Sequence, residues 1–441
     1  MTHDMTKGPL LRGLIGFTIP LVLGNVLQLT YNAVDSIIVG RCVGSAALAA
    51  VSTSNPLMTL IIMFVQGISL GAGILIGNLF GAHDEAALRR QVSTGMISGS
   101  VFSLCLAALV FLITPWLLSA LQVSPDIRPL AAAYLRIISC GLIFNFIYNF
   151  FASTLRAMGD SRSPLLFLGV SAVLNILGDL ALVVWFRMGI AGCAVSTVVS
   201  EALSCAMCYA YITRKVPLLN MGRAWLVFDA SMLGRTLRYG SVSAIQQSTV
   251  QLGILGVQGQ VNSLGVTATA AFGAANRIDD YALIPERNIA NAMTAVMAQN
   301  DGAGEHGRVR RAFALGMAIE LSYGILAGAA LLLTARPLMR LFTGDPDVIE
   351  TGVIYLRMIA LMYVLPAFTN GVQGYFRGVG QLKITLVSSL INMGVRFAVS
   401  VVLVQRFGMG IQAVPWSCMA GWLAMSVCEL PWLIRRLKTN G

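Results

Sequence analysis

The stretch GAHDEAALRRQVSTGM, residues 81–96, decides the architecture, because it has a counterpart in GAGEHGRVRRAFALGM, residues 302–317. The offset is 221 residues, and the same offset places PDIRPLAAAYLRII (125–138) over PDVIETGVIYLRMI (346–359). One constant offset across separate segments indicates an internal duplication. We therefore expect two halves that share one fold.

The composition assigns this duplicated chain to the membrane proteins. Of its 441 residues, 56% are hydrophobic and only 11% are charged, whereas a typical soluble domain has about 25% charged residues. A bilayer span needs about 20 mostly apolar residues. On this basis the sequence predicts twelve spans: 13–39, 46–80, 92–114, 131–152, 164–186, 189–212, 233–261, 267–298, 311–333, 352–373, 383–405 and 409–433.

Six spans in each half is an even number, so the two halves have the same orientation. We expect an all-α membrane protein with twelve transmembrane helices in two six-helix lobes, related by a pseudo-two-fold axis along the membrane normal. The predicted N-lobe is 1–212, the predicted C-lobe is 231–441, and a cytoplasmic loop, 213–230, joins them.

The distribution of basic residues predicts the orientation in the membrane. With a cytoplasmic N-terminus, 19 Lys and Arg residues fall on the cytoplasmic side and 8 on the other side. Basic residues are enriched in cytoplasmic loops, so both termini are expected in the cytoplasm and the protein in the plasma (inner) membrane. The same rule explains the net charge of +11, and no nucleic-acid partner is expected.

Several function classes lack their motifs in this sequence. It contains no GxxxxGK[ST] motif, no HExxH motif and no serine-nucleophile elbow, so neither ATP-driven transport nor an intramembrane enzyme is expected. Cys205 and Cys208 form a CxxC pair within an apolar span, where packing explains them better than a metal site does. We expect no cofactor other than a coupling ion.

The first span carries a polar stripe that ends in an acid. Asn25, Gln28, Asn32 and Asp35 are spaced by 3, 4 and 3 residues, which places them on one helical face. An acid within the bilayer core is costly, so it normally faces a cavity or a partner.

The fifth and sixth spans carry further polar residues, Asn175, Asp179, Thr197 and Glu201. At 1.5 Å per residue, Asp35, Asp179 and Thr197 all lie roughly 9–12 Å from the outer ends of their spans. Two carboxylates, an amide and a hydroxyl at one depth can bind a hard cation such as sodium. They can also share a proton. The structural alternative is that each acid only forms a hydrogen bond with a neighbouring helix.

The duplication does not repeat this acidic cluster. At +221, Asp35 becomes Gly256 and Asp179 becomes Ser400. A residue kept only for packing could recur in both halves, so its absence from the second half favours a function specific to the first lobe.

The second half has charges of its own. The stretch NRIDDYALIPER (276–287) includes Asp280 and Glu286, and Glu320 lies in the next span. One interpretation is internal salt bridging around Pro285. The alternative is a cavity that contacts cationic substrates, or a second titrating site. Gln28, Asn32 and Glu201 are the corresponding candidates for the substrate cavity in the first lobe.

Taken together, several segments resemble one known family, the multidrug and toxic compound extrusion (MATE) transporters. The resemblance extends over roughly residues 10–430. The segments that carry it are IPLVLGNVLQLTYNAVDSIIVG (19–40), GNLFGAHDEAALRR (77–90), TLRAMGDSRSPL (154–165), LNILGD (174–179), LGVTATAAFGAANRI (264–278) and MAQNDGAGE (297–305). It implies export of bulky, often cationic, organic compounds in exchange for protons or sodium ions.

The resemblance also assigns residues. Pro20 matches the helix-bending proline of the first span, and Asp35, Asn175, Asp179 and Thr197 match the family's cation-coupling residues. There is one departure, because the seventh and tenth spans lack the carboxylates of the sodium-coupled branch. This favours coupling in the N-lobe.

The expected function is therefore a secondary multidrug antiporter that works by alternating access. We expect it to act as a monomer on small drug-like molecules in the lipid bilayer. A flippase for lipid-linked precursors from the same superfamily is the main alternative, and a duplicated channel is another. A flippase would favour a cationic cavity and often fourteen spans, whereas this sequence predicts twelve spans and an acidic cluster.

Overall fold

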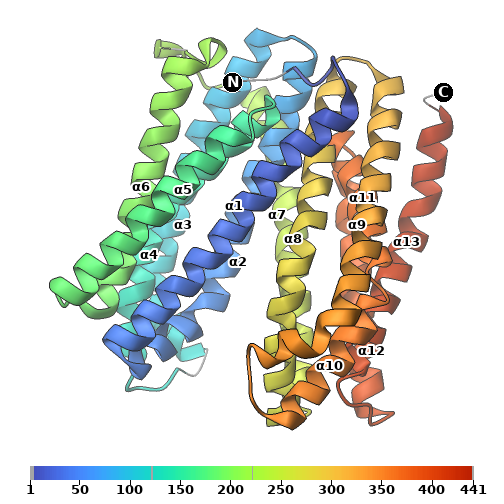
Figure 1. Cartoon of the computed structure of the whole chain (residues 1–441). Coiled ribbons are helices and arrows are strands. Elements are labelled where there is room, and N and C mark those ends of the chain that lie inside the picture. Colours follow the sequence, from blue (N-terminus) through green and yellow to red (C-terminus); the bar gives the residue numbers. More distant parts are fainter. Residues whose placement is uncertain (1–3, 121–122, 221, 440–441) are drawn as a thin grey trace. The chain divides into compact units, whose positions relative to one another are not determined.

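The computed structural model describes residues 4–120, 123–220 and 222–439, and every regular element in this part of the chain is a helix (Figure 1). The predicted all-α fold class is confirmed. The α-helices are α1 (Leu10–Ile38), α2 (Ser45–Gly81), α3 (Glu85–Ala120), α4 (Arg128–Ala157), α5 (Arg162–Asp179), α6 (Gly189–Lys215), α7 (Ala230–Asn262), α8 (Val266–Gly302), α9 (His306–Arg340), α10 (Pro346–Ala360), α11 (Val364–Gly378), α12 (Leu382–Gln405) and α13 (Ala413–Thr439). Four short elements complete the chain: the π-helices η1 (Val39–Val43) and η2 (Leu180–Trp185), and the 3₁₀-helices η3 (Pro217–Leu219) and η4 (Gly222–Leu226).

Each predicted span corresponds to one helix, with one exception. The predicted span 352–373 is covered by two helices, α10 and α11, which meet at an angle of 52°. Among the described residues, nine helices are long and apolar enough to cross a membrane, or ten if this bent pair counts as one span. The other two, α7 and α8, are 33 and 37 residues long, so they have the length of a span but are more polar.

The chain divides into two compact units. Unit 1 is formed mainly by Ile19–Ala244, and unit 2 by Met5–Thr18 together with Ile245–Gly441. The division therefore falls within α1 and within α7 rather than in the loop between the halves. The predicted lobe limits at 212 and 231 remain a prediction.

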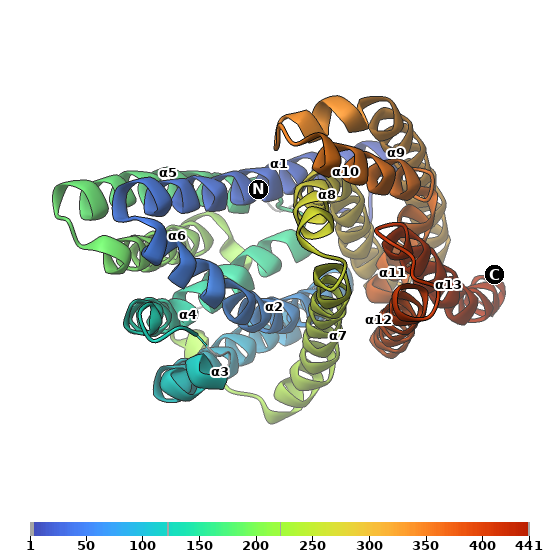
Figure 2. The same cartoon turned by 90° about the horizontal axis from the view of Figure 1, so that it is seen from below.

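In unit 1, α4 packs against α2, α3 and α6. Its aromatic side chains Phe146 and Phe150 are 0% and 1% exposed. A Cβ atom at Gly99 of α3 would lie 1.9 Å from the Phe146 ring, so only glycine admits this ring. Figure 2 shows α6 between α4 and α5, and α6 packs against both of them.

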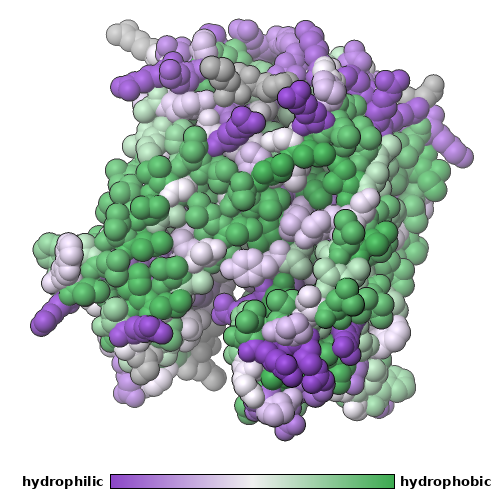
Figure 3. Space-filling view, in the orientation of Figure 1, coloured by the Kyte–Doolittle hydropathy of each residue, from purple (hydrophilic) through white to green (hydrophobic). Residues whose placement is uncertain are grey.

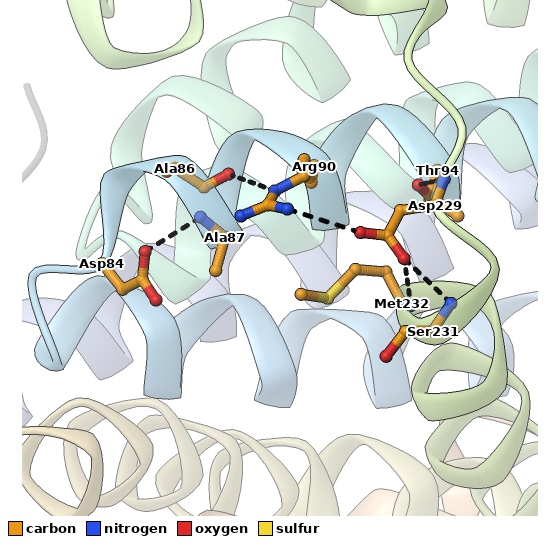
Figure 4. Close-up of polar contacts among 8 residues, drawn as sticks. All are labelled: Asp84, Ala86, Ala87, Arg90, Thr94, Asp229, Ser231 and Met232. Atoms are coloured by element: carbon orange, nitrogen blue, oxygen red, sulfur yellow. Dashed lines mark hydrogen bonds and ion pairs between the residues drawn. The ribbon is translucent and has the colours of Figure 1, made fainter.

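The connection between the halves is attached to unit 1 through α3. Arg90 lies 3.7 Å from Asp229, and Oγ1 of Thr94 accepts a 3.0 Å hydrogen bond from the Asp229 backbone N–H (Figure 4). The Asp229 carboxylate in turn accepts from the N–H groups of Ser231 and Met232 at 2.9 and 3.2 Å. Asp229 therefore caps the start of α7, where backbone N–H groups lack partners within the helix.

In unit 2, α8 packs against α9, α10 and α11, and α12 packs against α13. The segment before α1 is also part of this unit. The Met5 N–H donates to Oε1 of Gln299 at 2.9 Å, and Asn300 and Arg308 donate to the Met5 carbonyl at 3.2 and 3.4 Å. Arg308 also donates to the Gly8 carbonyl at 3.1 Å.

Apolar side chains cover the outer faces of the helices. On the face shown in Figure 3, hydrophobic residues occupy the middle of the helices and hydrophilic residues gather at their ends. Large side chains such as Leu112 and Leu333 are 74% and 83% exposed. A soluble protein rarely exposes contiguous apolar surface of this kind, which is the surface that lipid contact requires.

Candidate functional site

The first predicted acid, Asp35, lies on α1 beside Asn175 of α5. When the Asn175 side chain is oriented with its nitrogen toward Asp35, as the surrounding hydrogen-bonding groups require, that nitrogen donates to both carboxylate oxygens at 2.9 and 3.2 Å. The opposite end of the amide lies 3.4 Å from Oγ of Ser196 and from Oγ1 of Thr197. Asn175 thus connects the acid of α1 to two hydroxyl groups of α6.

The second acid, Asp179, is the last residue of α5 and is 0% exposed. Its Oδ2 lies 3.8 Å from the Cys193 thiol, and its Oδ1 has no hydrogen-bond donor among the described residues. The carboxyl groups of Asp179 and Asp35 interact electrostatically with each other. Two ionised carboxylates that interact in this way repel each other, and a proton or a cation bound beside them relieves the repulsion.

A short π-helix follows each of the two acids along the chain. The α-helical part of α1 ends three residues after Asp35, where η1 begins, and η2 begins directly after Asp179. These two π segments contact each other. π-Helical turns are rare and occur often at functional sites. These π segments could not be predicted from the sequence, because they depend on backbone hydrogen bonds rather than on a residue pattern.

Of the six candidates for the substrate cavity, three belong to unit 1. The Glu201 carboxylate accepts a 2.7 Å hydrogen bond from Nδ2 of Asn145. The Tyr31 hydroxyl interacts with Gln28 and lies near both Glu201 and Asp35, so Gln28 and Glu201 are close to the acidic cluster. Asn32 is exposed on α1.

The other three candidates belong to unit 2 and lie in different surroundings. Asp280 forms an ion pair with Arg287 at 3.6 Å and accepts a hydrogen bond from Asn276 at 3.3 Å. Arg277, three residues before Asp280 on α8, is exposed. Glu286 and Glu320 are both 0% exposed.

Pro20 is buried within α1, and the helix continues through it. A proline removes one backbone donor, so the helix has one hydrogen bond fewer at this point. The division between the two units falls between residues 18 and 19, next to this proline.

Sequence reasoning missed a polar network in unit 2. Glu429 of α13 is 0% exposed and accepts hydrogen bonds from Ser388 and Gln373 at 2.6 and 2.5 Å. Gln246 donates to Gln373 at 2.7 Å. The Tyr363 hydroxyl donates to Asp279. Glu429 could have been found from the sequence, because it is a single acid within an apolar run, as Asp35 is.

The donor set around Asp35 suits a proton or a hard cation. The two carboxyl groups supply oxygen ligands of the kind that hard cations prefer, whereas Asn175 presents its amide nitrogen to Asp35 and its oxygen to the hydroxyl groups of α6. The buried Oδ1 of Asp179, which lacks a donor, is the position such an ion would fill. In the part of the chain that the structure describes, no three His, Cys, Asp or Glu side chains gather as a metal site.

A family model described as MatE matches residues 20–181 and 243–402, which is more than half of the chain. The chain belongs to the MatE family. The two matched segments correspond to the two halves of the duplication. The resemblance predicted from the sequence is thereby confirmed.

Curated relatives of this MatE protein are named as multidrug resistance proteins. Probable multidrug resistance protein YpnP of Bacillus subtilis (strain 168) is 29% identical over 395 residues, covering 89% of this chain and 88% of the relative. Probable multidrug resistance protein YoeA of the same organism is 30% identical over 414 residues, covering 91% and 89%.

The fold is also similar to that of a solved structure, the outward-facing conformation of a multidrug resistance MATE family transporter of the MOP superfamily. The TM-score is 0.88 over 100% of this chain and 98% of that chain, at 20% identity. These comparisons confirm that the chain is an integral membrane transporter of the MATE multidrug efflux family and has the two-lobed, twelve-helix fold. The family and the relatives are transporters and not enzymes.

Proposed function

We propose that this MatE protein is a secondary antiporter that exports organic, often cationic, compounds in exchange for protons or sodium ions. The observation that carries the proposal is the hydrogen bonding of Asn175 to Asp35, together with the buried Asp179, whose Oδ1 lacks a donor among the described residues. The names of the curated relatives support small-molecule drugs as the transported compounds.

The proposed coupling follows from charge. Without the ion, two carboxylates face each other and repel. Binding of a proton or sodium ion cancels part of that charge, so α1 and α5 can pack more closely. A bound ion shifts an equilibrium only through its different affinity for the two states. We propose that the packed state releases the drug outward and that loss of the ion restores the drug-binding state, with Thr197 and Asn175 orienting the ligands.

The test is dye efflux from proteoliposomes that contain the purified protein, with a pH gradient and a sodium gradient imposed separately. Efflux driven by only one of the two gradients identifies the coupling ion. Efflux at the same rate without any gradient would contradict antiport and would indicate a channel.

The substitution that tests the proposed coupling acid is Asp35→Asn. Asparagine retains the shape of the side chain but cannot bind a proton as a carboxylate does. We expect gradient-driven efflux to fall to the rate of empty liposomes, while membrane insertion is unchanged. Asp126→Asn is the control, because Asp126 is an exposed acid in the loop before α4. Wild-type efflux by an Asp35→Asn/Asp179→Asn double variant would show that the cluster does not couple transport.

A further inference from the structure

Unit 2 contains two buried acids that the proposed coupling scheme does not use. Glu286 of α8 and Glu320 of α9 are each 0% exposed. In the described part of the chain, none of their four carboxylate oxygens has a hydrogen-bond partner of normal geometry. An ionised carboxylate in such a place is expensive, and groups of this kind are neutralised in practice. These two side chains therefore need a ligand or a proton.

The charged and titratable groups around the pair do not neutralise it. The two carboxyl groups interact with each other. The neighbours are Asp279 and Arg287 on α8, Tyr323 on α9, Tyr363 before α11, and Asn370 and Arg377 on α11. Arg287 is already paired with Asp280. Arg377 interacts with both Glu320 and Glu429, so one guanidinium is shared between two carboxyl groups, and one of these lies outside the pair.

The helices around the pair pack so closely that a proton is the only ligand that fits. A Cβ atom at Gly374 of α11 would lie 2.8 Å from the Ala290 carbonyl of α8, so these helices touch through their backbones. With both acids fully buried, a bulky organic cation cannot reach them. A metal ion would need about six oxygen ligands, and no acidic metal cluster is found among the described residues. A proton needs neither space nor further ligands.

The duplication shows that packing does not require acids at these positions. At −221, Glu286 corresponds to Val65 and Glu320 corresponds to Gly99. Val65 is 0% exposed within an apolar cluster, and Gly99 packs against the Phe146 ring. The same fold therefore fills these positions with apolar residues in the first half, and only the second half places carboxyl groups there.

We propose that Glu286 and Glu320 form a proton-binding site of unit 2, separate from the cluster around Asp35. Arg377 supplies a positive charge beside Glu320. Coupling of this site to drug export rests on the proposed antiport, whereas the presence of the bound proton does not.

The first test measures the bound proton directly. Infrared difference spectra of the purified full-length protein, recorded as the pH is raised, report loss of protonated carboxyl groups. We expect part of this signal to disappear in Glu286→Gln/Glu320→Gln and to persist in Asp35→Asn/Asp179→Asn. Glu350→Gln should leave the spectrum unchanged, because Glu350 lies in an exposed ion pair with Arg336. A wild-type spectrum for Glu286→Gln/Glu320→Gln would overturn the proposal. The single variants Glu286→Gln and Glu320→Gln serve if the double variant does not fold.

The second test separates this site from the proposed function. If protons drive dye efflux, the efflux rate of the Glu286→Gln variant should depend less steeply on the pH gradient than that of the wild type, by one proton per cycle. An unchanged steepness would overturn the role of the site in transport. If Asp35→Asn leaves efflux intact, the coupling scheme of unit 1 is wrong. The infrared test of the unit 2 site does not depend on that outcome.

Discussion

At the scale of single residues, Asp160 is an acid with a structural role outside the membrane spans. It lies between α4 and α5, where its carboxylate accepts hydrogen bonds from the Ser163 hydroxyl at 2.7 Å, the Ser163 N–H at 3.0 Å and the Tyr211 hydroxyl at 3.0 Å. Burial alone would raise the pKa of Asp160, but these hydrogen bonds outweigh it and hold the pKa below its usual value. Asp160 therefore caps α5 in its ionised form.

This pKa gives the stabilisation a defined pH dependence. Because the folded-state pKa lies below the unfolded value of about 3.9, the contribution is present in full above that value and is lost as the pH falls through the folded pKa. We expect Asp160→Asn to reduce the free energy of unfolding by about 1–2 kcal/mol at neutral pH. Denaturant titrations should show a constant difference above about pH 5 that shrinks in acid. A difference that grows in acid would contradict this assignment.

Single residues also show how far the sequence could predict the site. The stripe spacing and the depth estimate were enough to associate Asp35, Asp179 and Thr197, since helical geometry alone fixes the face and the height of a side chain. The orientation of Asn175 was not predictable, because it depends on which hydrogen-bonding groups surround the amide. Glu286 and Glu320 lack hydrogen-bond partners because of the way the helices pack. The spacing of residues along the chain cannot predict this.

At the scale of helices, the bend between α10 and α11 has a local cause that the sequence contained. The predicted span 352–373 includes Pro366, which lies in the first turn of α11. A proline lacks the N–H that would bond to the preceding turn, so it fits the start of a helix better than its interior. Pro20 and Pro285, in contrast, lie within continuous helices. Among the described residues, apolar length accounts for ten of the predicted spans if the bent pair counts as one, whereas α7 and α8 are more polar. The effect of each proline depends on how the surrounding helices pack.

The contact between α8 and α11 gives a prediction at the same scale. Because a Cβ atom at Gly374 would lie 2.8 Å from the Ala290 carbonyl, Gly374→Ala forces the two helices apart. Overpacking of this kind typically costs about 1–3 kcal/mol. We expect a lower midpoint of thermal unfolding in detergent.

Gly273, on α8, is the matched control for this substitution. A Cβ atom there meets nothing within 4 Å, so Gly273→Ala should be neutral or slightly stabilising through helix propensity. If both variants lost the same stability, the close contact between α8 and α11 would not be the reason that Gly374 is needed.

At the scale of the whole molecule, the compact units do not coincide with the halves of the sequence. Residues 5–18 of the first half belong to unit 2, and residues 230–244 of the second half belong to unit 1. Within unit 1, Gln91 donates to Thr236 of α7 at 2.6 Å. The duplication predicted two halves correctly, but periodicity in the sequence cannot show which half completes which unit.

This arrangement predicts the behaviour of separated halves. We expect residues 1–221 and 222–441, expressed alone, to give no cooperative unfolding transition, because each lacks a segment of its unit. Co-expressed as two chains, they should assemble and recover gradient-driven dye efflux. A first half that begins at Ile19 should recover less, since unit 2 then lacks residues 5–18. A single half that unfolds as cooperatively as the intact protein would contradict the expectation.

The segments that attach to the units correspond to each other in the duplication. Residues 5–8, held by Gln299, Asn300 and Arg308, map at +221 onto residues 226–229, which include Asp229 beside Arg90 and Thr94. Each repeat therefore gives its leading arm to the other repeat, which is the connectivity of a domain-swapped dimer. A lone six-helix copy would need a second copy to complete its fold. Fusion into one chain replaces that concentration-dependent encounter with an intramolecular one. It also frees the two copies to diverge, so that one carries Asp35 and the other carries Glu286.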